Sequence, residues 1–100
     1  MTDENRVRVK VTVTGIVQGV GFRWWTKRLA ESLCVTGKVW NNPDGSVGIE
    51  VQGLETSVKS FTDALAGGPA GSLVLGVLTR AVPLVDDSGS FSVSFVREES

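Results

Sequence analysis

The amino-terminal part of the chain alternates between apolar and polar residues. Valines occupy every second position from Val7 to Val13, and charged residues and threonines stand between them. A period of two predicts a strand with one buried face. The apolar spacing then changes to that of an amphipathic helix, which is predicted from Phe22 to about Leu33.

The rest of the chain continues this order of elements. The further predictions are a strand over 35–42, a strand over 47–51, a helix over 55–66, a strand over 73–82 and a last strand with Phe91, Val93 and Phe95. A turn signal at Asn42–Gly45 makes the two middle strands a hairpin. The strand over 73–82 is apolar enough to be a buried one, although Gly76 weakens it.

This order of elements indicates one fold class. Strand, helix, strand, strand, helix, strand predicts a ferredoxin-like βαββαβ sandwich of the α+β class, with an antiparallel sheet, both helices on one face and an extra carboxy-terminal strand. The connections are short, so residues 1–100 are predicted to form a single domain.

The composition is that of a globular protein with little net charge. Hydrophobic residues make up 41% of the chain, charged residues make up 21%, and the formal net charge is −1. A nucleic-acid partner is not expected, because such binders carry a basic face. No apolar run is long enough to cross a bilayer, and the acidic start is not a secretory signal. With one cysteine, Cys34, and no intramolecular disulfide, the protein is predicted to be cytoplasmic.

The segment Gly15–Arg23 is the first candidate site. Its three glycines allow backbone N–H groups to converge on an anion, and the following helix adds N–H groups without partners. Arg23 lies in the first turn of that helix, where a guanidinium can bind two phosphate oxygens. The loop has neither the Lys-Ser/Thr pair of a P-loop nor the dinucleotide glycine spacing. On its glycines alone, it fits a phosphate site and an ordinary connection equally well.

Asn41 is the second candidate. It closes a predicted strand just before a turn, and its amide can donate one hydrogen bond and accept another, as the holding of a water molecule requires. Taken alone, an asparagine at this place is more often a turn former.

Two motifs together give the chain a family resemblance. They are G-x-V-Q-G-V-x-F-R over residues 15–23 and G-x-V-x-N-x-x-D-G-x-V over residues 37–47. The pair closely resembles the acylphosphatase family, and the element order, the chain length and the Gly68-Pro69 pair extend the resemblance to nearly all of the chain. The resemblance implies a ferredoxin-like fold and hydrolysis of the carboxyl–phosphate bond of small acyl phosphates, without a metal or another cofactor.

The resemblance also implies roles for the matching positions. Arg23 binds the phosphoryl group, and Asn41 orients the attacking water. The backbone amides that assist Arg23 belong to Gln18, Gly19, Val20, Gly21 and Phe22. The expected partner is a small acyl phosphate, with no nucleic acid and no membrane, and the protein is expected to be a monomer.

The residue content agrees with this chemistry. The chain has no histidine, and with a single cysteine the common zinc sites cannot be built. An alkoxide that leaves a phosphate ester usually needs a general acid to protonate it. A leaving carboxylate needs none, because its conjugate acid has a pKa of ~4. A site without an obvious acid therefore favours acyl phosphates over phosphomonoesters.

Three positions depart from the family pattern. Lys38 stands where an aromatic residue is common, Trp40 where a basic one is, and Gly48 where an acidic one is. Lys38 and Trp40 flank Asn41, and we expect them to reshape the rim of the site. All three departures are expected to affect substrate preference. Trp24 lies off the apolar stripe of its helix and could border the site or simply bury surface.

Two other functions stay open at this point. The chain could be a binding module that senses phosphate-like anions, or an acylphosphatase-like domain of an assembly, in which case phosphate would bind without hydrolysis. RNA recognition shares the order of elements but needs exposed aromatic residues on the central strands, and the first strand offers Arg8, Lys10 and threonines instead.

Overall fold

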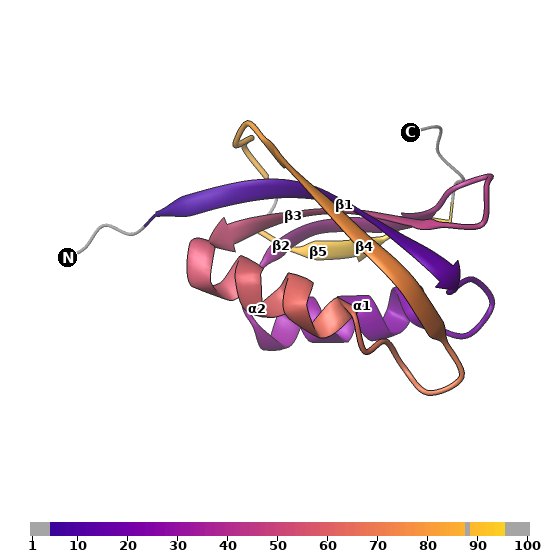
Figure 1. The fold of residues 1–100 in the computed structure, drawn as a ribbon. Coiled ribbons are helices and arrows are strands. Elements are labelled where there is room, and N and C mark those ends of the chain that lie inside the picture. Colours follow the sequence, from indigo (N-terminus) through magenta and orange to yellow (C-terminus); the bar gives the residue numbers. More distant parts are fainter. Residues whose placement is uncertain (1–4, 88, 96–100) are drawn as a thin grey trace.

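The computed structural model describes residues 5–87 and 89–95. Its elements are β1 (Arg6–Ile16), α1 (Phe22–Ser32), β2 (Thr36–Asn41), β3 (Val47–Leu54), α2 (Glu55–Leu65), β4 (Leu73–Val82) and β5 (Phe91–Val93). The strands form one sheet in the order β4-β1-β3-β2-β5, and both helices cover the same face of it (Figure 1). The predicted ferredoxin-like sandwich is confirmed.

The sheet is antiparallel except at one edge. β1 pairs with β3 and β4, and β2 pairs with β3, all in antiparallel register. The short β5 pairs with β2 in parallel register, from Gly37 opposite Phe91 to Val39 opposite Val93. The extra carboxy-terminal strand therefore makes the sheet a mixed one.

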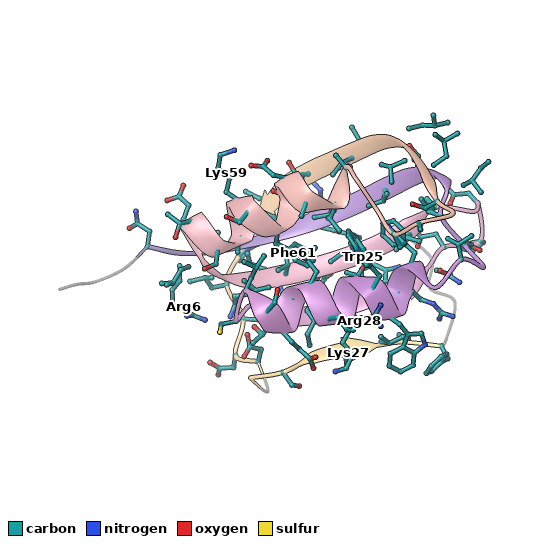
Figure 2. The ribbon with its side chains drawn as sticks, turned by 90° about the horizontal axis from the view of Figure 1, so that it is seen from below. Arg6, Trp25, Lys27, Arg28, Lys59 and Phe61 are labelled. Atoms are coloured by element: carbon teal, nitrogen blue, oxygen red, sulfur yellow. The ribbon has the colours of Figure 1, made fainter. Side chains whose placement is uncertain are left out.

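The core lies between the sheet and the helices. Val11 and Val13 of β1 are completely buried, as the alternation predicted, and their partners in β3, Ile49 and Val47, are completely buried as well. Figure 2 looks up at the two helices, with Phe61 of α2 labelled; this ring is fully buried. The other core side chains of the helices are Phe22, Ala30, Val58 and Leu65.

Two expectations about the carboxy-terminal part are wrong. β4 is mostly exposed, with the Leu75 side chain 73% accessible, because the strand lies at the sheet edge and pairs only with β1. An edge strand has one neighbouring strand, and the helices cover only one face of this sheet, so several apolar side chains of β4 stay exposed. The last strand ends at Val93, and Phe95 lies beyond it with its ring exposed.

The chain between β4 and β5 passes from one edge of the sheet to the other, and Gln52 of β3 holds it. The Gln52 amide donates to the Val85 carbonyl at 2.9 Å and to Asp87 Oδ2 at 2.9 Å, and it accepts from the Val85 N–H at 3.0 Å. Arg8, also buried, donates to Glu50 at 2.6 Å. The hydrogen bonds of Gln52 hold residues 85–87 against β3, and at the far edge Lys27 of α1 donates to the Phe91 carbonyl at 2.8 Å.

Candidate active site

The β1–α1 loop and the β2–β3 turn lie at the same end of the molecule (Figure 1). The side chain of Gln18 joins them. Its amide nitrogen donates to the Asn42 carbonyl at 2.9 Å and to the Ser46 carbonyl at 2.8 Å. Because both acceptors belong to the backbone of the turn, Gln18 fixes the phosphate-loop candidate relative to the strand end that carries Asn41.

Two glycines of the loop have backbone conformations that other residues rarely adopt. Gly19 and Gly21 have φ values of +78° and +76°, in the left-handed region that favours glycine. Gly21 is the N-cap of α1, and no side chain caps the helix there. The N–H groups of the first turn of α1 are therefore free to meet an anion at the positive end of the helix dipole.

A pocket of about 160 Å³ opens between this loop and the end of β2. Of the site residues predicted from the sequence, five line it: Gly19, Gly21, Phe22, Arg23 and Asn41. Gln18 and Val20 do not line it, since Gln18 points to the turn and Val20 packs against the core. The structure thus brings the two candidate catalytic side chains, from separate elements, to one small hollow.

Arg23 is held at the pocket by the carboxy-terminal segment. Its Nη1 donates to the Ser94 carbonyl at 2.7 Å, and its Cζ lies 5.0 Å from the centroid of the Phe95 ring. A guanidinium has five N–H groups, so the contact with Ser94 leaves others for a ligand. A cation over an aromatic face also gains electrostatic stabilisation.

The turn that follows Asn41 is tied by its own side chains. The hydroxyl and the backbone N–H of Ser46 both donate to Asp44 Oδ1, at 2.6 and 2.9 Å, and these hydrogen bonds hold the pKa of Asp44 below its ordinary value. Because the pKa of Asp44 is lower in the folded protein than in the unfolded chain, its carboxylate stabilises the fold at pH values above the pKa of the unfolded chain. This stabilisation is lost as the pH falls through the pKa of the folded protein. At neutral pH the turn therefore keeps its shape beside Asn41.

Three further side chains lie at or near the site. Val17 and Trp24 line the pocket, although the motifs did not assign them a role. For Trp24 the available signal was its place next to Arg23 and off the apolar stripe. Trp40 lies over Gly48 and donates to Asn42 Oδ1 at 2.8 Å, buried and outside the pocket lining. Trp40 was expected at the rim of the site and does not lie there; the missing Cβ at Gly48 instead makes room for its buried indole.

We expect Gln18→Glu to lower both stability and activity. The replacement keeps the shape of the side chain but sets a carboxylate oxygen against the carbonyls of Asn42 and Ser46, where the amide now donates. Two lost hydrogen bonds and an unpaired polar atom cost about 2–4 kcal/mol, and a displaced loop should cut kcat/KM about tenfold or more. Urea unfolding and initial rates measure the two effects. Gln52→Glu, a matched change away from the pocket, should lower stability alone.

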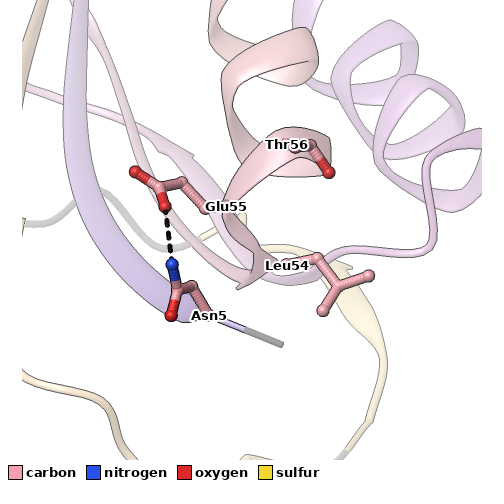
Figure 3. Close-up of a pocket in the computed structure, with 4 residues that line it drawn as sticks. All are labelled: Asn5, Leu54, Glu55 and Thr56. Carbon is pink, nitrogen blue, oxygen red and sulfur yellow. Dashed lines mark hydrogen bonds between the residues drawn. The ribbon is translucent and has the colours of Figure 1, made fainter. Parts of the chain in front are cut away.

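A second hollow, of about 230 Å³, lies where β3 meets α2 (Figure 3). It is lined by Asn5, Leu54, Glu55 and Thr56, and the Asn5 amide donates to Glu55 at 3.4 Å. Its one charged lining residue is acidic, so this hollow does not suit a phosphate. Within residues 5–87 and 89–95, no cluster of three metal-ligating side chains occurs. In the same residues, no helix has the length and apolar character to cross a membrane.

Several known proteins are similar to this chain in sequence and in structure. A family model described as acylphosphatase matches residues 9–93. An acylphosphatase of Rhizobium etli is 40% identical over 94 residues, which cover 94% of this chain and 99% of that protein. Among solved structures, an acylphosphatase from Coxiella burnetii has a TM-score of 0.87 at 35% identity, covering 94% of this chain and 100% of that one. Full-length HypF, in its phosphate- and nucleotide-bound form, gives a TM-score of 0.85 at 28% identity over 93% of this chain and 12% of its own.

Proposed function

The chain belongs to the acylphosphatase family and hydrolyses acyl phosphates, and from this membership we propose that Arg23 binds the phosphoryl group and Asn41 orients the attacking water. One observation carries the proposal. Arg23, from the first turn of α1, and Asn41, from the end of β2, line the same small pocket together with the loop glycines.

The phosphoryl group enters with its non-bridging oxygens toward the N–H groups of the loop and of the first turn of α1. The guanidinium of Arg23 neutralises charge on two of these oxygens and stabilises it further as it moves in the transition state. These groups are fixed by the backbone and by the Ser94 contact, so they need little rearrangement during the reaction.

Asn41 holds a water molecule in line with the bond that breaks. The water oxygen forms a bond to phosphorus, the bond from phosphorus to the bridging oxygen breaks, and the carboxylate leaves with the electron pair. The proton of the water passes to a phosphate oxygen, so the products are a carboxylate and inorganic phosphate.

The chain has no histidine to protonate a leaving group. A carboxylate leaves unaided, since the pKa of its acid is near ~4, whereas an alkoxide or a phenolate is a much poorer leaving group. The proposed site therefore acts on the anhydride and leaves ordinary phosphomonoesters intact.

We also propose that the protein works as one domain and as a monomer in the cytoplasm, on a small substrate and without nucleic acid. The single cysteine, which is a free thiol, and the small charge of the chain support this. Gel filtration coupled to light scattering checks the monomer.

The proposal is tested by the substrate range of the purified protein. Acetyl phosphate should release phosphate at a rate that a chelator does not change, and phenyl phosphate should turn over at least about a thousandfold more slowly. Equal rates on the two compounds would contradict the proposed site. Phosphate binding without any hydrolysis would favour the second candidate, a domain that binds phosphate-like anions.

A further inference from the structure

Two aromatic rings adjoin the mouth of the pocket. Trp24 lines the pocket, and its ring lies 5.9 Å from the ring of Phe95, centroid to centroid, with an angle of 50° between the planes. Phe95 in turn covers Arg23. Trp24 and Phe95, which we call the aromatic pair, therefore form an apolar surface beside the cation that is proposed to bind the phosphoryl group.

The aromatic pair is open to solvent. Trp24 is 46% exposed and Phe95 is 69% exposed. Single exposed apolar residues are ordinary on protein surfaces, but neighbouring ones at the edge of a pocket mark a place where a ligand can cover them. Large aromatic side chains supply much contact area at small entropic cost, since their rings rotate about two bonds only.

The size of the pocket decides where the acyl group lies. Its volume is about 160 Å³, well under the ~300 Å³ at which pockets begin to enclose drug-sized ligands. The phosphoryl group occupies the inner part, against the loop N–H groups and Arg23. The acyl group must then extend past the rim, and Trp24 is the one aromatic residue besides the buried Phe22 in the described lining.

We propose that the aromatic pair binds the acyl group of the substrate, so that the enzyme prefers acyl phosphates with an aromatic or extended apolar acyl group. This inference rests on the proposed function of Arg23 and Asn41, since it takes the position of the phosphoryl group from them. The apolar part of the acyl group packs on the exposed faces of Trp24 and Phe95, and its carbonyl stays at the pocket mouth.

Two acyl phosphates that differ only in the acyl group test the proposal. Benzoyl phosphate carries a phenyl ring where acetyl phosphate carries a methyl group. In Trp24→Ala and in Phe95→Ala, the KM for benzoyl phosphate should rise about five- to tenfold, as expected when an aromatic contact is lost. The KM for acetyl phosphate should rise by less than about twofold, so the ratio of the two KM values is the readout. Phe95→Ala also loses the contact with Arg23, so this variant is judged by that ratio and not by kcat.

Control variants keep the result interpretable. Leu78→Ala removes an equally exposed apolar side chain from β4, away from the pocket, and should change neither KM. Trp24→Phe keeps an aromatic face and should restore much of the preference for benzoyl phosphate. The inhibition constant of inorganic phosphate, which occupies only the inner pocket, should be unchanged in Leu78→Ala and in Trp24→Phe.

The inference is overturned if the ratio of the two KM values stays at its wild-type value in both alanine variants. The inference is also overturned if kcat falls equally on both substrates while the ratio of the KM values is unchanged. That result would mean that the aromatic pair only positions Arg23. Failure of the proposed function looks different: Arg23→Ala or Asn41→Ala would then keep its turnover of acetyl phosphate, whatever Trp24 does.

Discussion

Replacing Arg23 with alanine should lower kcat/KM for acetyl phosphate by about a thousandfold or more. Arg23 is the one cationic side chain in the described lining of the pocket, so its loss leaves the phosphoryl charge to the loop N–H groups alone. The inhibition constant of inorganic phosphate should rise as well, because the ground state uses the same guanidinium. Initial rates of phosphate release, with and without added phosphate, measure both effects.

The Arg23 variant should remain folded. It loses one hydrogen bond to the Ser94 carbonyl and the contact with Phe95, which together cost about 1–2 kcal/mol of unfolding free energy. Arg28→Ala is a matched control, since it removes the same charge from an exposed position of the same helix (Figure 2). Arg28→Ala should keep full activity. An Arg23→Ala enzyme with wild-type turnover would exclude Arg23 from phosphoryl binding.

Asn41→Ala should lower kcat about a hundred- to a thousandfold and leave the inhibition constant of phosphate nearly unchanged. Asn41 is proposed to hold the water and not the phosphoryl group, so its loss removes positioning in the transition state and little ground-state binding. This split separates its role from that of Arg23, whose replacement weakens phosphate binding too. Initial rates over a range of substrate and phosphate concentrations measure it.

Two further variants control the Asn41 result. Asn5→Ala makes the same chemical change at the second hollow (Figure 3), which shares no lining residue with the pocket of Asn41, and should leave kcat as it is. Asn41→Asp keeps the size of the side chain but adds a negative charge at the pocket, and it should impair both kcat and phosphate binding. If Asn41→Ala raised the inhibition constant and left kcat intact, the water-holding role would be refuted.

The local elements could be predicted from the sequence because they depend on local patterns. The valines of β1, the spacing of α1 and the turn at Asn42–Gly45 each reflect a period or a backbone preference within a few residues. The burial of β4 could not be predicted in this way. A strand of apolar residues is the same in sequence at the edge and at the centre of a sheet, and only the strand order places β4 at the edge.

Those residues of the candidate site that belong to the two motifs could be predicted from the sequence. Arg23, Asn41 and the loop glycines lie in the two motifs, and the structure brings them to one pocket. The contacts that orient them join residues far apart in the chain, as in the hydrogen bond from Arg23 to Ser94. The role of the Gln18 side chain, which joins the loop to the turn, could not be predicted for the same reason. Its hydrogen-bond partners belong to a turn that only folding brings beside the loop.

The fate of the water oxygen tests the central claim most directly. Turnover of acetyl phosphate in water enriched in ¹⁸O, followed by mass spectrometry of both products, shows which atom the water attacks. If the phosphoryl group lies against Arg23 with the water at Asn41, one ¹⁸O enters inorganic phosphate and none enters acetate. Label in the acetate would mean attack at the carbonyl carbon, and the pocket would then not direct water to phosphorus.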